Sequence, residues 1–207
     1  MFDFKIMGSM KYVPFGMLAL VCTFCYLFHR DIQVYGIVLE MMMPCLGIWW
    51  SGFYLSEHTE DAAIRGVIFS INKRMKGYLI GKYFLYSLLW QLLGTALTCF
   101  IVYHNEGRIA SELLRVVFLK GIFLSTVVFV TIAFIRDASW AIVIVVSLLC
   151  VDYCLDGAVL GKLDLSLYWY RLSPMKVTAA VFFKPALASL TLMLMGSVRL
   201  LRRGGDR

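Results

Sequence analysis

Apolar residues gather in six long runs along this 207-residue chain, and short polar segments separate them. The six runs cover residues 12–28, 34–55, 78–103, 113–135, 140–155 and 185–201. Each is close to the length of about 20 residues with which a helix crosses a hydrocarbon core roughly 30 Å thick. None alternates as the strands of a membrane barrel do. The pattern therefore predicts an all-α integral membrane protein with six transmembrane helices.

The composition supports this interpretation and excludes an ordinary soluble domain. Hydrophobic residues make up 61% of the chain, and its mean hydropathy is +0.80, whereas soluble domains rarely exceed half apolar residues. The first run lacks a small-residue cleavage site, so we expect it to be a retained helix and not a signal peptide. No linker or soluble module interrupts the pattern, and residues 1–207 are expected to form one transmembrane domain.

Lys and Arg are distributed unequally between the two sides of the predicted bundle. With both termini on one side, that side holds twelve of them and the other side holds eight. The two densest clusters, 73–76 and 199–207, both lie on the side of the termini. Because basic residues favour the cytoplasmic side, we expect both termini there, in a multi-pass protein of the bacterial inner membrane. The net charge of +7 then reflects topology and contact with anionic lipid, and it does not require a nucleic-acid partner.

The six cysteines fall almost entirely within the apolar runs. They are Cys22, Cys25, Cys45, Cys99, Cys150 and Cys154. The C-x-x-C pair of Cys22 and Cys25 is typical of metal or redox sites in other settings. Within an apolar span it favours small packing residues instead. Cys150 and Cys154 are one helical turn apart, which does not suit a disulfide, and we expect all six to be free thiols.

The connection between the second and third runs has the pattern of an amphipathic helix over about residues 59–72. Thr59 is a favoured N-cap residue, and Glu60 and Asp61 follow in the first turn, where acidic groups complement the helix dipole. Asp61 and Arg65 are spaced to pair on one face. The apolar residues at helical spacing are Ile64, Val67, Ile68 and Ile71. The basic residues that follow are Lys73, Arg74 and Lys76.

The connection between the fifth and sixth runs, about residues 156–184, is too apolar for a solvated loop. It carries the aromatic cluster Tyr168, Trp169 and Tyr170 and then Pro174. Trp and Tyr concentrate at membrane interfaces. We therefore expect re-entrant or interfacial helices in the outer leaflet, with protein covering their ends.

The sequence GYLIGKY at residues 77–83 superficially resembles a phosphate-binding loop. A P-loop needs four residues between its first glycine and the Gly-Lys pair, followed by Ser or Thr. Here three residues separate Gly77 from Gly81, and Tyr83 follows Lys82. A membrane helix also begins at this point, with no buried strand before it. We therefore expect that the chain does not bind ATP.

No set of polar residues has the pattern of a catalytic or metal site. His29, His58 and His104 fall at or beyond the ends of the runs, without acidic partners at zinc-ligand spacing. Asp152 and Asp156 are one turn apart and are suited to a cation, but solvated carboxylates at a helix end are the simpler interpretation. We expect no catalytic residue, no metal and no cofactor in this chain.

Glu40 is a carboxylate placed about two turns inside the second run. A charge at that depth is costly and usually faces the interior of a bundle or a water-filled path. Lys120, near the outer end of the fourth run, is a possible partner. Two interpretations stay open: a structural ion pair, or a role in a substrate path.

The order of these features resembles the permease subunit of ABC-2-type ABC transporters. The resemblance covers six helices, cytoplasmic termini, an amphipathic segment after the second helix and a membrane-dipping segment before the sixth. The local features that match are Glu60-Asp61, the helix to Ile71, Lys73-Arg74, Gly81-Lys82 and the Ser-Pro pair of YRLSP at residues 170–174. No single motif is specific, and the order of features carries the resemblance.

This resemblance implies a function as well as a fold. The inner helix would be a coupling helix that docks on a separate ATPase subunit, where ATP and Mg²⁺ would be bound. Two permease copies, identical or related, would frame one path that moves a peptide, lipid or drug outward. The residues implied in coupling are Glu60, Asp61, Ile64, Arg65, Ile68, Lys73 and Arg74. Those implied in the substrate path are Glu40, Trp49 and Trp50.

Three other functions compete with this one. The substrate-binding membrane subunit of an energy-coupling-factor importer is also a small six-helix protein, but FGMLALVCTF lacks the A-x-x-x-A docking face expected on an early helix. An intramembrane enzyme is disfavoured because no polar constellation is present. A non-transport membrane scaffold would have no ATPase partner at all.

Overall fold

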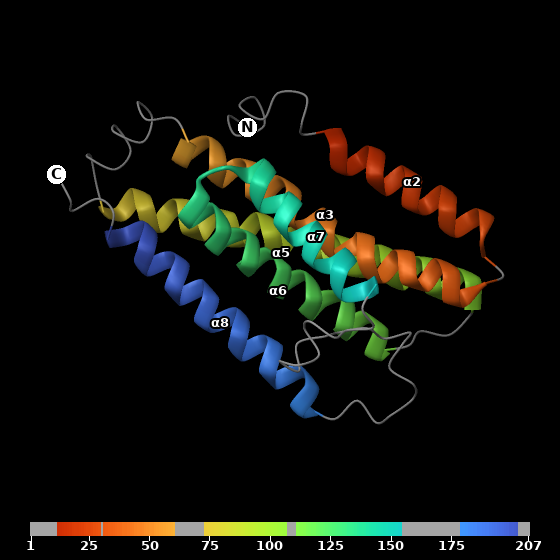
Figure 1. Cartoon of the computed structure of the whole chain (residues 1–207). Helices are drawn as coiled ribbons and strands as arrows, with labels where there is room; N and C mark the ends of the chain where they lie inside the picture. The colour runs from red at the N-terminus through yellow and green to blue at the C-terminus, as the bar shows by residue number, and fades with distance from the viewer. Residues whose placement is uncertain (1–11, 30, 61–72, 107–110, 155–178, 203–207) are drawn as a thin grey trace.

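Six helices make up the part of the chain that this computed structural model describes, namely residues 12–29, 31–60, 73–106, 111–154 and 179–202 (Figure 1). They are α2 (Val13–Leu27), α3 (Ile32–Glu60), α5 (Lys73–Glu106), α6 (Ser111–Ile135), α7 (Ala138–Cys154) and α8 (Ala179–Arg202). These residues include no β-strand. The prediction of an all-helical fold is confirmed, with one helix for each apolar run.

Four of these helices are long and apolar enough to cross a membrane. The qualifying segments are Gly36–Ser56 of α3, Gly77–His104 of α5, Leu114–Ile135 of α6 and Phe183–Leu201 of α8. The apolar parts of α2 and α7 are shorter than 18 residues. A membrane protein follows from the four long helices, whereas six crossings remain a prediction.

Three helices extend five or six residues beyond the apolar runs that predict them. α3 continues to Glu60 and α5 begins at Lys73, so Thr59 and Glu60 belong to α3 and the rest of the expected inner helix lies outside the described residues. α8 begins at Ala179 and contains Pro185. Of the expected re-entrant segment, residues 179–184 are therefore the start of α8, and the remainder is not described.

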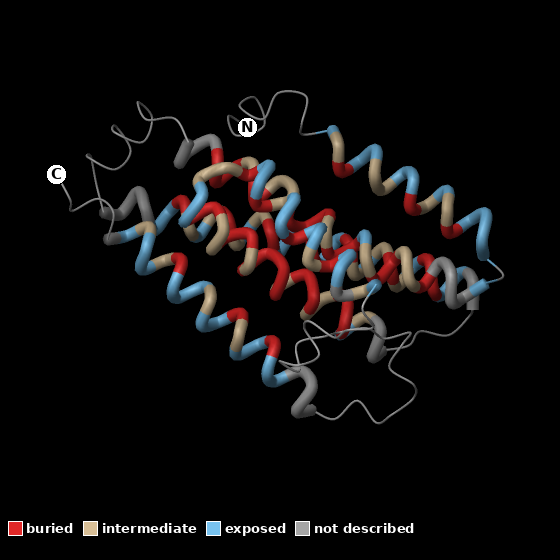
Figure 2. The backbone as a smooth tube through the Cα atoms, in the orientation of Figure 1, coloured by how far each residue is buried: buried red, intermediate tan, exposed pale blue. Residues whose placement is uncertain are grey.

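α3 and α6 lie at the centre of the bundle. α3 packs against α2, α5, α6 and α7, while α6 packs against α3, α5, α7 and α8. Figure 2 shows buried residues concentrated on α3, α5 and α6, whereas α2 and α8 are buried on narrow stripes. The outer helices therefore present most of their surface to the surroundings.

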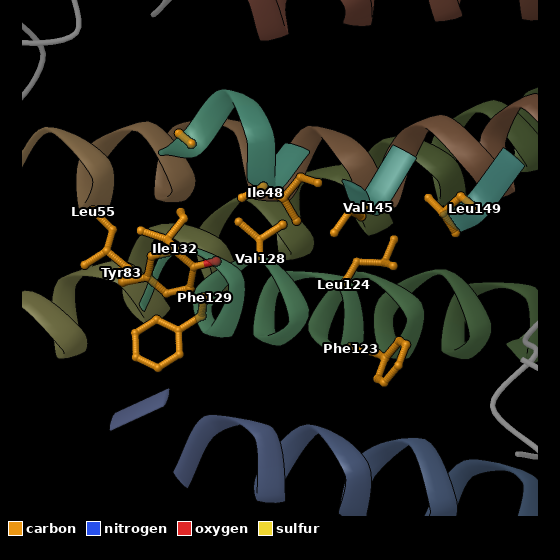
Figure 3. Packing of buried hydrophobic residues seen from close by; sticks show 12 residues of the cluster. Ile48, Leu55, Tyr83, Phe123, Leu124, Val128, Phe129, Ile132, Val145 and Leu149 are labelled. Carbon is orange, nitrogen blue, oxygen red and sulfur yellow. The ribbon is translucent and has the colours of Figure 1, made fainter. Parts of the chain in front are cut away.

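The largest buried cluster joins α3, α5, α6 and α7. In Figure 3, Ile48, Val128 and Val145 meet between α3, α6 and α7. Tyr83 is fully buried and donates a hydrogen bond from its hydroxyl to the Ser125 carbonyl at 2.6 Å. In a bilayer such packing and interhelical hydrogen bonds hold helices together, because lipid tails are as apolar as the side chains.

The turn between α6 and α7 is only two residues long. Arg136 adopts the left-handed conformation with φ 69° and donates its N–H to the Ile132 carbonyl at 2.8 Å, which closes α6. Asp137 then caps α7, since its Oδ1 accepts hydrogen bonds from the N–H groups of Ser139 and Trp140 at 2.7 and 3.3 Å. The Ser56 hydroxyl of α3 accepts another from the Ala138 N–H at 3.2 Å.

Candidate functional site

Glu40 and Lys120 form an ion pair inside the bundle. Glu40 of α3 and Lys120 of α6 are 2% and 4% exposed, and Lys120 Nζ lies 3.4 Å from Glu40 Oε1. The partner proposed from the sequence is therefore the one that Glu40 contacts. Both charges face the interior of a single chain, which favours the ion-pair interpretation of Glu40.

A third buried polar residue, Gln91 of α5, lies at the junction of the same helices. Its Nε2 donates a hydrogen bond to the Pro44 carbonyl of α3 at 3.1 Å, and the side chain is 1% exposed. It fits between two glycines: a Cβ added at Gly47 would lie 2.7 Å from Gln91 Cδ, and one at Gly121 of α6 would overlap the Gln91 amide. The absence of two side chains thus makes the slot that Gln91 fills.

The Glu40–Lys120 pair joins α3 to α6, and Gln91 joins α5 to α3 one turn further along, at Pro44; we call these three residues the polar hub. Pro44 removes one helical hydrogen bond at this level because its nitrogen carries no hydrogen. Glu40 is four residues inside the spanning part of α3 and Lys120 six inside that of α6, or about 6 and 9 Å along the helix axes. Separating the pair would leave each charge in an apolar medium, so the contact holds α3 and α6 in one position along each other.

Aromatic rings form a second feature, the aromatic layer, where α2, α3 and α5 meet. Trp50 and Trp90 have ring centroids 4.3 Å apart, and Phe15 lies 5.5 and 5.9 Å from them. Trp90 is 4% exposed, and its indole N–H has no hydrogen-bond partner among the described residues. Trp49, the neighbour of Trp50 in the sequence, contacts Phe53 with ring centroids 5.2 Å apart.

Gly77, Gly81 and Lys82 all lie on the continuous helix α5. Their N–H groups lie along a helix beyond its first four residues and so bond to helical carbonyls, which is incompatible with a phosphate-cradling loop. Lys82 instead places its Nζ over two rings, 5.0 Å from the Tyr78 centroid and 5.5 Å from the Tyr54 centroid. The basic residue of the motif is thus held by cation–π contacts.

The residues expected to act in coupling are only partly within the described residues. Glu60 ends α3, and Lys73 and Arg74 begin α5. Since α3 and α5 pack side by side and run in opposite directions, these three positions share one end of the bundle (Figure 1). The other four, Asp61, Ile64, Arg65 and Ile68, lie outside the described residues.

The six cysteines are all free thiols, as the sequence predicts. Cys150 and Cys154 are exposed on α7, whereas Cys25 is buried against α3 in a cluster with Val21 and Leu39. Within the described residues, no three His, Cys, Asp or Glu side chains are grouped so as to hold a metal ion.

Charge separates the two ends of the described bundle. The end formed by the start of α5, the α6–α7 turn and the finish of α8 carries seven Lys and Arg, and we call it the basic end. They are Lys73, Arg74, Lys76, Lys82, Arg136, Arg199 and Arg202. The opposite end carries two, Arg115 and Lys184, with four acidic residues, whereas the basic end has three acidic residues, Glu57, Glu60 and Asp137.

Comparison of the chain with protein-family models, with curated proteins and with solved structures gave no significant match. The sequence and the geometry of the bundle are therefore the basis for the function proposed below.

Proposed function

We propose that this chain is the membrane-spanning subunit of an ABC exporter of the ABC-2 type. The supporting observation is the order of helices and connections. Two long connections, residues 61–72 and 155–178, separate α3 from α5 and α7 from α8, whereas the other connections are tight. The first follows the second helix and the other precedes the sixth, which is the order that the resemblance requires.

In this proposal the basic end faces the cytoplasm and both termini lie there. The excess of Lys and Arg at that end supports this orientation. α2 and α7 cross the membrane with the four longer helices, so that the chain spans the inner membrane of a bacterium six times. Exposed large apolar side chains along α5 and α8 then contact lipid or a second permease copy.

The connection between α3 and α5 is the coupling element of the proposal. Its amphipathic pattern suits a helix that rests in a groove of an ATPase subunit, which holds ATP and Mg²⁺. Glu60, Lys73 and Arg74 mark the ends of the two helices that flank it. Closure of the ATPase would move α3 and α5, and α3 would transmit the movement through the polar hub to α6.

The substrate path in this proposal follows α3, through Trp50 and its aromatic neighbours. Trp49 and Trp50 are half-buried, so their rings are accessible from outside the core. Such rings suit an apolar or amphiphilic substrate, such as a peptide, lipid or drug. Glu40 contributes by holding α3 against α6, because its carboxylate already contacts Lys120.

Purification of the tagged chain from its native membrane in mild detergent tests the proposal. We expect a nucleotide-binding subunit in stoichiometric amount by mass spectrometry, and we expect Arg65→Glu to weaken its retention several-fold. Arg115→Glu, at the opposite end of the bundle, is the matched control and should retain the ATPase. Both variants should elute as the wild type does in size-exclusion chromatography.

Absence of an ATPase, or an ATPase that is retained equally by Arg65→Glu, would contradict the coupling-helix proposal. The first result would favour a membrane scaffold. An ATPase bound together with a second, unrelated membrane subunit would favour the substrate-binding subunit of an energy-coupling-factor importer.

A further inference from the structure

Trp90 places a hydrogen-bond donor without a partner near the middle of the spanning part of α5. It lies thirteen residues after Gly77 and fourteen before His104, about 20 Å from either end along the helix axis. Its side chain is 4% exposed, and its indole N–H has no hydrogen-bond partner among the described residues. Tryptophan usually lies at the membrane interface, where the N–H meets polar groups. A hydrocarbon core supplies no water, so an unpaired donor at this depth is costly and calls for an acceptor.

Rings from two other helices contact Trp90 within the aromatic layer. The Trp50 ring of α3 makes an edge contact with Trp90 at 4.3 Å between centroids, and the Phe15 ring of α2 makes another at 5.9 Å. Phe15 is 53% exposed, and its helix lies at the edge of the bundle (Figure 1). The Phe15 ring is therefore the part of the layer that an entering molecule can displace with the least loss of buried contact.

The residues of the layer restrict the chemistry of such a molecule. An indole N–H donates and does not accept, so the molecule must carry an acceptor. The three rings are uncharged, and Lys120 of the polar hub is already paired with Glu40, so a phosphate or carboxylate would be costly at this depth. Edge contacts with the layer favour a molecule that itself carries a flat ring. An uncharged carbonyl compound meets these conditions.

We propose that the aromatic layer binds an uncharged lipophilic molecule with a carbonyl group, whose oxygen accepts a hydrogen bond from Trp90 Nε1. The molecule enters from the hydrocarbon core by displacing the Phe15 ring, and its apolar part packs against Trp50. Its assignment as the transported substrate rests on the proposed function above, whereas its binding is measured on the chain alone. Absence of an ATPase partner would overturn the export function and leave this site intact, and loss of binding would overturn the site alone.

Fluorenone, a flat uncharged ketone, is the probe, and fluorene has the same rings without the carbonyl oxygen. Binding of each tritiated compound is measured by scintillation proximity on the chain in phosphatidylcholine nanodiscs. Comparison of the two compounds in the same variant cancels their partition into lipid. Trp90→Phe keeps a ring and removes the donor, and we expect it to lower the preference for fluorenone over fluorene about fivefold, as one neutral hydrogen bond supplies. Trp140→Phe, at a tryptophan of α7 that is 61% exposed, is the matched control and should keep the preference.

A second measurement needs no variant and so does not depend on the folding of one. Hydrogen bonding weakens a carbonyl bond, so fluorenone labelled with carbon-13 at its carbonyl should show a lower-frequency infrared band that saturates as the wild-type chain fills. Absence of this saturable band would overturn the proposal. An equal preference for fluorenone in the wild type and Trp90→Phe would also overturn it, as expected if a trapped water is the partner of the indole. Equal binding of fluorene and fluorenone by the wild type would overturn the assignment to a carbonyl compound.

Discussion

Glu40 and Lys120 show how a charge pair inside a membrane bundle couples two residues that are 80 positions apart in sequence. Glu40→Gln leaves the buried ammonium without its carboxylate, and we expect it to lower the free energy of unfolding by about 3–5 kcal/mol. Lys120→Met should have a comparable effect. The double variant should cost much less than the sum, which unfolding by SDS titration from detergent micelles can measure.

The same variants separate the two interpretations of Glu40. If the pair is structural, transport and stability should fall together in Glu40→Gln and recover together in the double variant. Additive losses of stability would contradict the coupling of the two charges. A transport defect with unchanged stability would instead support a role in the substrate path.

The packing of Gln91 allows a second prediction at the residue scale. The space that its side chain occupies exists because Gly121 has no side chain. Gly121→Ala should lower the free energy of unfolding by about 1–3 kcal/mol through overpacking. Gly81→Ala is the matched control, since its new Cβ meets open space among the described residues, and it should leave stability unchanged or slightly higher.

A second substitution shows whether Gln91 is the cause. Gln91→Ala combined with Gly121→Ala should be less destabilising than the sum of the two single changes, because the shorter side chain no longer fills the slot. Equal effects of Gly121→Ala and Gly81→Ala in the same SDS titration would argue against the slot.

At the residue scale, the sequence predicts how deep a polar residue lies within its apolar run. It does not predict which residues of the other helices that polar residue contacts. Glu40 is conspicuous as an acid within an apolar run, and Lys120 is a nearby cation at a similar predicted depth. Gln91 carries a comparable signal, a polar amide in the run LLWQLLG, yet its contacts with Gly47 and Gly121 depend on how three helices are rotated against one another. The same holds for Trp90 and for the rings around Lys82.

Among the helices, the tight turn between α6 and α7 depends on the cap that Asp137 provides. Asp137→Ala removes the acceptor for two N–H groups of α7, and we expect a loss of about 0.5–2 kcal/mol in the free energy of unfolding. Asp137→Asn keeps a side-chain oxygen and should preserve most of the stability. Thermal unfolding in one detergent can compare the variants, and equal stability of Asp137→Ala and wild type would contradict the capping role.

Helix bounds were harder to predict than helix positions. Hydropathy marks the part of a helix that matches the hydrocarbon core, and the backbone continues as a helix where charged residues replace apolar ones. This explains why α3 reaches Glu60 and α5 begins at Lys73, several residues beyond the apolar runs. The sixth apolar run begins at Pro185, but α8 begins six residues earlier and contains Pro185 in its second turn, where Ser189 Oγ donates to the Pro185 carbonyl at 2.7 Å.

For the whole molecule, the segregation of charge predicts how the bundle sits in the membrane. Ser139 lies beside the α6–α7 turn at the basic end, and His29 lies at the opposite end, where α2 finishes; both are exposed. In a variant without native cysteines, Ser139→Cys should react with a membrane-impermeant maleimide only in inverted vesicles. His29→Cys should react only in intact spheroplasts, because the two positions would face opposite compartments.

The same labelling experiment also tests whether α7 crosses the membrane, as the six-crossing topology requires. If α2 and α7 cross the membrane along with α3, α5, α6 and α8, His29 and Cys154 share the outer face, and a variant with Cys154 as its sole cysteine should label from the same side as His29→Cys. If α7 were only embedded in one leaflet, the sole Cys154 and Ser139→Cys would label from the same side instead. Labelling of both ends from one compartment would therefore contradict the six-helix topology, while opposite labelling would support the inward-facing basic end on which the proposed coupling depends.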